Sequence, residues 1–135
     1  MWLVLLMAGI IDLKKRIILP LHPRTKKYLK DYSIKIAENI KIIEPVGYLE
    51  MLGLEKNAKA IITDSGGVQK EAFFLKIPCF TLRNETEWIE TLENGWNNLN
   101  FSAAQILEHL KTKLPEQKQF FGDGKAAEKI IEYLK

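Results

Sequence analysis

The chain has 135 residues, of which 47% are hydrophobic and 27% charged, and its net charge at pH 7 is +3. This length and composition predict one soluble globular domain with a core of its own. The net charge is small and the lysines are spread along predicted helices, so we expect no nucleic-acid partner. The only cysteine, Cys79, lies in an apolar run; it excludes an internal disulfide and indicates a buried residue in a reducing, cytoplasmic compartment.

The N-terminal stretch, residues 2–15, is apolar with few polar interruptions. It is predicted to form a mostly buried helix, although residues 2–6 could equally form a strand. It is too short to cross a bilayer, and it lacks the basic start and the cleavage site of a signal peptide. We therefore expect a core element at this end and no membrane partner.

Short apolar runs and helical segments then alternate along the chain. Strands are predicted at residues 17–20, 40–43, 60–63, 79–82 and within 96–101. Helices are predicted at residues 24–32, 48–57, 66–75, 103–114 and about 123–133, with a shorter one ending near residue 95. This alternation predicts an α/β fold of the Rossmann-like, three-layer αβα type, with a parallel sheet between two layers of helices. Residues 1–135 contain no linker or internal repeat, which indicates a single domain.

The most informative stretch is the turn between the strand at 60–63 and the helix that follows it. Asp64 or Ser65 can cap that helix, which leaves other first-turn N–H groups unpaired. Gly66 and Gly67 have no Cβ, so another group can approach the backbone closely. Unpaired donors at the positive end of a helix dipole form an anion site, and phosphate is its usual ligand. An ordinary capped turn is the alternative, because the pattern is neither GxGxxG nor a P-loop.

Three polar loops follow strand ends and should meet at one edge of a parallel sheet, where ligands of such folds bind. They begin near His22, Ser65 and Arg83. His22 can donate a hydrogen bond to phosphate or exchange a proton near neutral pH. Arg83 can bind phosphate or, alternatively, neutralise a nearby carboxylate in its own loop. Glu71, in the helix after the glycine turn, can accept two hydrogen bonds from a ribose diol.

Several of these segments resemble, in order and spacing, the C-terminal half of the non-hydrolysing UDP-N-acetylglucosamine 2-epimerases. The similarity runs from about residue 16 to residue 135. The matching residues are His22-Pro23-Arg24-Thr25, Gly47-Tyr48-Leu49, the run 63–72 (TDSGGVQKEA), the run 82–88 (LRNETEW) and Gly95-Trp96-Asn97. The resemblance implies a Rossmann-like half of the two-domain GT-B arrangement, with a nucleotide sugar between the halves and with no cofactor or metal.

The resemblance also implies roles for individual residues around a UDP-sugar. Ser65, Gly66 and Gly67 correspond to the residues that hold the diphosphate, and Glu71 to the residue that binds the uridine ribose. Two further positions line the nucleotide: Met51 near the uracil, and His22 near the diphosphate as the one catalytic candidate. Residues that line the cleft are Arg83, Thr86 and Glu87.

The reaction implied is the interconversion of UDP-N-acetylglucosamine and UDP-N-acetylmannosamine, through elimination of UDP and its re-addition. That chemistry needs general acid and base carboxylates, which in the family come mainly from the N-terminal domain. That domain has no counterpart here, nor does the first strand of the C-terminal domain with its His-Arg-x-x-Asn segment. Smaller departures are Lys70, in place of a second glutamate, and the segment 97–100. We therefore expect a chain that is inactive alone.

In a doubly wound sheet the missing first strand is central, so its loss should expose neighbouring strands. Residues 2–7 are one candidate to take its place; a homo-oligomer or a partner chain that supplies the N-terminal domain is the other. Two functions remain as alternatives to an epimerase half: the nucleotide domain of a GT-B glycosyltransferase, and a non-catalytic binding or assembly module.

Overall fold

A computed structural model describes residues 15–134, so the element predicted at residues 2–15 lies, except for its last residue, outside the described part. The predicted strands are present as β1 (Ile17–Pro20), β2 (Ile40–Ile43), β3 (Ile61–Thr63), β4 (Cys79–Thr81) and β5 (Asn97–Leu99). The helices are α2 (Pro23–Asp31), α3 (Tyr48–Lys56), α4 (Gly66–Phe74), the 3-10 helix η1 (Ile89–Gly95), α5 (Ala103–His109) and α6 (Ala126–Tyr133). The predicted α/β class is confirmed.

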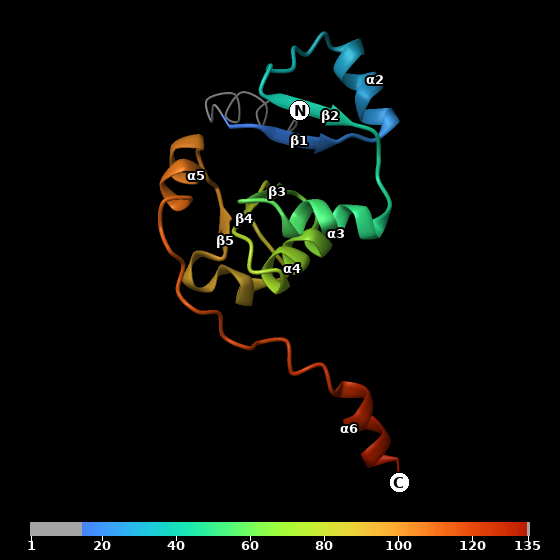
Figure 1. Ribbon diagram of the computed structural model, residues 1–135, viewed down its shortest axis with the longest axis vertical. Coiled ribbons are helices and arrows are strands. Elements are labelled where there is room, and N and C mark those ends of the chain that lie inside the picture. The colour runs from blue at the N-terminus through green and yellow to red at the C-terminus, as the bar shows by residue number, and fades with distance from the viewer. Residues whose placement is uncertain (1–14, 135) are drawn as a thin grey trace.

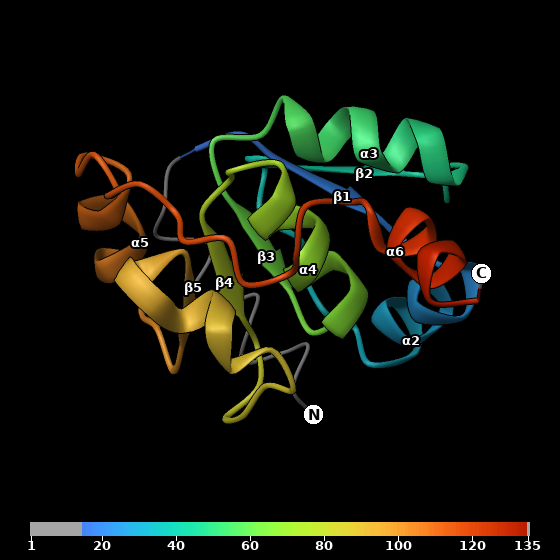
Figure 2. The ribbon, with the colours of Figure 1, turned by 90° about the horizontal axis from the view of Figure 1, so that it is seen from below.

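All the strand pairs are parallel, as the alternation of strands and helices predicts. β1 pairs with β2, and β4 pairs with β3 on one side and with β5 on the other. The pairs do not join into one sheet within residues 15–134: β1–β2 and β3–β4–β5 are separate sheets. Figures 1 and 2 show the five strands following one another across the molecule in the order β2, β1, β3, β4, β5. Within residues 15–134, the interruption therefore lies between β1 and β3.

The core lies around β4, the strand with a neighbour on each edge. One cluster is centred on Ile40, Phe80 and Ile106 and therefore joins β2, β4 and α5. The rings of Phe80 and Phe101 meet edge to face, with centroids 5.3 Å apart. A second cluster of Ile61, Ala72 and Cys79 packs α4 against β3 and β4.

Cys79 is 1% exposed, and burial raises the pKa of its thiol to about 11. A thiol with so high a pKa stays protonated near neutral pH, when it is a poor nucleophile. The structure thus agrees with the prediction that Cys79 is a core residue.

Two predicted helix boundaries are wrong. The helix expected to reach residue 114 ends at His109, because its last turn tightens into i to i+3 bonds from Lys111 N to Glu108 O and from Thr112 N to His109 O. The closing helix begins at Ala126, not at Asp123. Asp123 instead accepts a hydrogen bond from the Lys125 amide, forming a turn before the helix.

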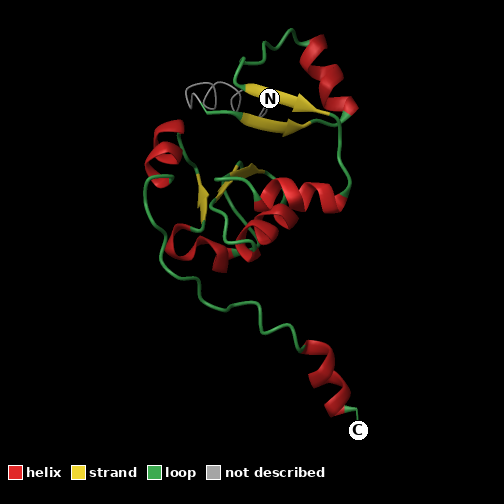
Figure 3. Cartoon of the chain, viewed as in Figure 1, coloured by secondary structure: helices red, strands yellow, loops and turns green. Residues whose placement is uncertain are grey.

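The C-terminal segment extends away from the two sheets. Residues 110–125 contain no regular helix or strand, and α6 projects at the far end of the molecule (Figures 1 and 3). None of its residues is buried, including Ile130, Ile131 and Tyr133. Across residues 15–134, no helix has the length and apolarity needed to cross a membrane.

Candidate functional site

The turn between β3 and α4 has the open geometry that its sequence predicts. Ser65 is the N-cap of α4, with its backbone N–H donating to Thr63 Oγ1 at 3.0 Å and its carbonyl accepting from Gln69 N at 3.1 Å. The Ser65 hydroxyl makes no capping bond. Within the described residues, the amides of Gly66, Gly67 and Val68 have no acceptor. The positive end of α4 therefore presents free donors, as an anion site requires.

The two glycines of this turn have different surroundings. A Cβ on Gly67 would meet only Ser65 Oγ, at 3.8 Å, so that side of the turn is open. A Cβ on Gly66 would lie 3.3 Å from Glu87 Oε2 and 3.4 Å from Trp88 Nε1. Gly66 thus allows the loop of residues 83–88 to pack against the turn, whereas Gly67 leaves space for a ligand.

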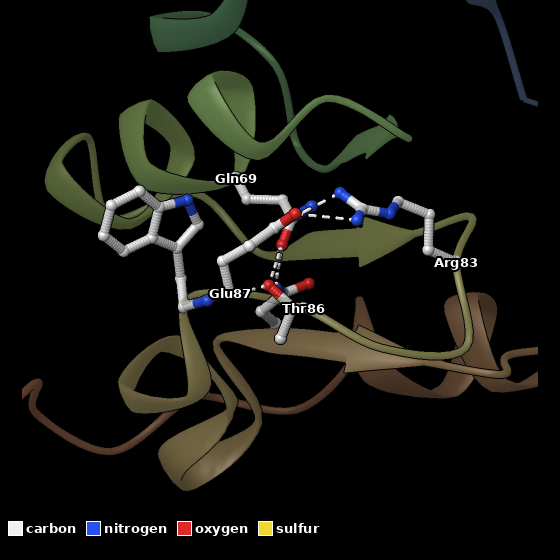
Figure 4. A network of polar contacts seen from close by, with 6 residues as sticks. Gln69, Arg83, Thr86 and Glu87 are labelled. Atoms are coloured by element: carbon white, nitrogen blue, oxygen red, sulfur yellow. Dashed lines mark hydrogen bonds and ion pairs between the residues drawn. The ribbon is translucent and has the colours of Figure 1, made fainter.

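That loop carries an ion pair beside the turn. Arg83 donates from Nη2 to Glu87 Oε1 at 2.7 Å and from Nη1 to Glu87 Oε2 at 3.2 Å (Figure 4). The pairing raises the pKa of Arg83 and lowers the pKa of Glu87. Of the two possibilities left open for Arg83, the structure shows neutralisation of a loop carboxylate. A hollow of about 280 Å³ is lined by Arg83, Glu85, Thr86 and Glu87.

A buried polar network, which sequence reasoning missed, holds the loop against α4. Gln69 is fully buried, and its Oε1 accepts from Thr86 Oγ1 at 2.5 Å (Figure 4) and from Asn97 Nδ2 at 3.1 Å. Asn97 in turn accepts from Thr81 Oγ1 at 2.7 Å and donates to Thr91 Oγ1 at 3.1 Å. The network connects α4, the loop, β4, β5 and η1, so it fixes the position of Thr86 and Glu87 relative to the turn.

Glu71 lies farther along α4, on the side that faces α3. A hydrogen bond with its carboxylate, together with the carboxylate's charge, raises the pKa of Tyr48.

Sequence reasoning also missed Glu55, a residue of α3. It is 2% exposed, and neither of its carboxylate oxygens has a hydrogen-bond partner in the described part of the chain. Burial, reinforced by the charge of Glu71, raises the pKa of Glu55 to about 7.

The remaining two predicted residues lie on other elements. His22 is exposed and acts as the N-cap of α2, with Nδ1 accepting from Arg24 N at 3.2 Å. No hydrogen bond recorded for residues 15–134 joins it to the α4 turn. Met51 is half-buried in α3. The structure thus brings Ser65, the glycines and the 83–88 loop together, while the roles of His22, Met51 and Glu71 stay predictions.

The described residues contain no group of three or more His, Cys, Asp or Glu side chains arranged to hold a metal ion. The groups that the candidate site offers are free backbone donors, a guanidinium paired with a carboxylate, and the Thr86 hydroxyl held by Gln69.

Comparison with known proteins shows relatives of one kind. A family model described as UDP-N-acetylglucosamine 2-epimerase matches residues 4–135. A "UDP-N-acetylglucosamine 2-epimerase homolog" of Methanococcus maripaludis is 52% identical over 133 residues, which cover 93% of this chain and 37% of the relative. The UDP-N-acetylglucosamine 2-epimerase of Methanocaldococcus jannaschii is 50% identical over 128 residues, covering 89% of this chain and 35% of that protein. The chain therefore spans little more than a third of these relatives, matching their C-terminal portion.

Solved structures agree with the sequence comparison. The crystal structure of the Methanocaldococcus jannaschii enzyme in complex with UDP-GlcNAc and UDP matches 98% of this chain and 40% of its own, with a TM-score of 0.82 and 46% identity. The Neisseria meningitidis enzyme bound to UDP-GlcNAc matches with a TM-score of 0.68 and 29% identity. With the family model, the relatives and the fold in agreement, the chain belongs to the UDP-N-acetylglucosamine 2-epimerase family.

Proposed function

We propose that this chain binds the UDP part of a UDP-sugar and forms the nucleotide-binding portion of a cytoplasmic 2-epimerase that interconverts UDP-N-acetylglucosamine and UDP-N-acetylmannosamine. The observation that carries the proposal is the open N-terminus of α4, where the amides of Gly66, Gly67 and Val68 point outward without acceptors. A diphosphate satisfies these donors and interacts favourably with the helix dipole.

The other predicted residues are assigned to the remaining parts of the nucleotide. Glu71, half-buried between α3 and α4, accepts hydrogen bonds from the ribose hydroxyls, and Met51 packs near the uracil. Arg83, released from Glu87, pairs with a phosphate oxygen. That exchange costs little, because Glu87 is exposed and Arg83 is partly exposed, and ion pairs open to solvent contribute little stability. His22 lies near the diphosphate as a proton donor.

We further propose that the chain does not catalyse epimerisation alone. The reaction removes a proton from the carbon that bears the acetamido group and releases UDP, and it returns both to reach the other epimer. General acid and base groups beside the sugar are required for this. This chain spans about a third of its relatives, and its candidate site offers phosphate and ribose contacts. The rest of the enzyme supplies the missing carboxylates.

Isothermal titration with UDP tests the proposed site. Glu71→Ala should weaken UDP binding about 5- to 150-fold, which corresponds to the usual cost of about 1–3 kcal/mol for leaving hydrogen-bonding groups unpaired. Gly67→Val should block the diphosphate while it leaves the fold intact, because a Cβ there meets only Ser65 Oγ at 3.8 Å. Glu108→Ala, which removes an exposed carboxylate of α5, is the matched control. Unchanged UDP affinity in both site variants refutes the proposal.

A further inference from the structure

Lys70, a half-buried residue of α4, directs its ammonium group at two aromatic rings. Its Nζ lies 4.1 Å from the centroid of the Trp88 ring and 4.8 Å from that of the Phe121 ring. The two rings themselves meet edge to face, with centroids 6.1 Å apart. A cation over an aromatic ring is attracted by the ring's quadrupole, and tryptophan gives the strongest attraction. Lys70 therefore holds together two side chains that come from distant parts of the sequence.

The indole of Trp88 also lies against the turn that opens α4. A Cβ on Gly66 would be 3.4 Å from Trp88 Nε1, so the nitrogen edge of the indole covers that side of the turn. The backbone of Trp88 is fixed separately: its N–H donates to Thr86 Oγ1 at 3.1 Å, and its carbonyl accepts from Thr91 Oγ1 at 2.6 Å. The position of the indole depends instead on side-chain contacts, and the ammonium group and the phenyl ring described above supply two of them.

Phe121 belongs to a segment, residues 115–121, that runs back across α4 (Figure 2). Gln117 Nε2 donates to the backbone carbonyl of Phe73 at 2.8 Å. The ring of Phe121 packs with its centroid 5.5 Å from those of Phe73 and Phe74. These contacts hold the segment on α4, so its phenyl ring offers a fixed surface to the ammonium group and to the indole.

We propose that Lys70 is a positioning residue of the nucleotide site, because it holds the indole of Trp88 against Gly66. Phe121 supports the same indole from the C-terminal segment. This role rests on the proposed function, which places the diphosphate at the turn that Gly66 opens. A side chain that is already in place when the ligand arrives loses no freedom on binding, so a fixed indole wall increases the affinity for the diphosphate.

The alternative is that the Lys70 ammonium attracts the diphosphate by its charge alone. Charge alone acts whether or not an indole is present, whereas positioning requires Trp88. A double-mutant cycle of Lys70→Met and Trp88→Leu separates the two roles, because it measures how far the effect of one residue depends on the other.

Isothermal titration of the full chain with UDP measures the cycle. Lys70→Met removes the cation and keeps an apolar stem, and it should weaken UDP binding about 2- to 5-fold, as expected for the loss of a partly exposed cation–π contact. Lys70→Arg keeps a cation over the rings and should restore the affinity. In the Trp88→Leu chain, Lys70→Met should have no further effect. Lys59→Met removes an exposed lysine at the other end of β3 and is the control for net charge.

The indole itself gives a readout that does not depend on UDP. In NMR spectra of the chain without nucleotide, the nuclear Overhauser effect between the Trp88 indole N–H and the Gly66 α-protons reports their proximity. It should weaken in Lys70→Met and stay as in the unaltered chain in Lys70→Arg and Lys59→Met. Phe121→Leu, which changes no charge, should weaken it as well, because one of the two rings beneath the ammonium is lost.

Three results overturn the positioning role. Equal UDP affinity in Lys70→Met and the unaltered chain removes Lys70 from the site. The same loss of affinity with and without Trp88 shows that charge alone acts. An unchanged Overhauser effect in Lys70→Met shows that other contacts hold the indole.

Failure of the proposed function looks different, because the unaltered chain then binds no UDP, and the positioning role falls with it. Urea denaturation of each variant verifies that it is folded. Should Trp88→Leu not fold, the Overhauser effect in Lys70→Met and the recovery of UDP affinity in Lys70→Arg decide the question.

Discussion

The two sheets of this chain have similar apolar strands but very different surroundings. β4 has a strand on each side, and all of its residues are buried. Among residues 15–134, β1 has one neighbouring strand; none of its residues is fully buried, and Ile18 is 43% exposed. Both strands form because short β-branched or aromatic runs favour extended backbone. The difference shows that β4, which packs in both core clusters, carries most of the burial, whereas β1 lies at the margin of one.

The largest effect on the free energy of unfolding should come from replacing one large apolar side chain in each sheet by alanine. Phe80 of β4 is 1% exposed, and its ring meets those of Phe101 and His109. Phe80→Ala should reduce the free energy of unfolding by about 3–5 kcal/mol, whereas Ile18→Ala should cost about 1 kcal/mol or less, because Ile18 is nearly half exposed. Urea denaturation measures both. Similar losses in the two variants contradict the comparison.

A second prediction concerns the buried polar network around Gln69, which joins α4 to the three-stranded sheet. Gln69→Leu removes the acceptor of Thr86 Oγ1 and Asn97 Nδ2, so the free energy of unfolding should fall by about 1–3 kcal/mol. The control, Gln105→Leu, removes a capping bond at the exposed start of α5 and should cost about 0.5–1 kcal/mol. A stability gain in Gln69→Leu indicates that the network does not stabilise the loop.

The pH dependence of stability should reveal Glu55. Its pKa in the folded chain is raised to about 7, so between about pH 4.5 and 7 the folded state binds more protons than the unfolded state. Stability is therefore highest at the acidic side of this window and decreases by roughly 1–2 kcal/mol as pH rises through it. Glu55→Gln should flatten that part of the stability profile, measured by urea denaturation at several pH values. An unchanged slope in the variant excludes Glu55 as its cause.

The smallest effect is expected at the C-terminus. Deleting residues 123–135 removes α6, none of whose described residues is buried, and should change the free energy of unfolding by less than about 0.5 kcal/mol. Phe121 must be kept, because its ring packs 5.5 Å from those of Phe73 and Phe74. A large loss of stability on this deletion shows that α6 packs on the body of the protein in solution.

Much of the fold can be predicted from local sequence, because the signals are local. The runs at 17–20 and 40–43 are strands at those positions, and α4 begins at Gly66 as its glycine turn indicates. The predicted end of α5 is wrong because the apolar pattern continues to Leu114, whereas the helix ends five residues earlier, where the backbone changes to i to i+3 hydrogen bonds. The separation of β1–β2 from β3–β4–β5 within residues 15–134 cannot be predicted from any local run, because it depends on which strands meet in the finished fold.

The candidate site is only partly predictable for the opposite reason: its supports are not local. The α4 turn can be deduced from Ser65, Gly66 and Gly67 because the caps and glycines act within a few residues. The Gln69–Asn97 bond joins residues 28 positions apart, so it depends on the finished packing of α4 against β5. Glu55 looks like a surface residue of a helix until α3 and α4 are placed together.

The amides at the start of α4 provide the most direct test of whether this turn holds a diphosphate. In an NMR titration of the chain with UDP, the signals of Gly66, Gly67 and Val68 should shift along one saturation curve, while those of the exposed Gly122 and Gly124 stay in place. Absence of these shifts at saturating UDP, or shifts confined to another part of the chain, contradicts the proposed nucleotide site.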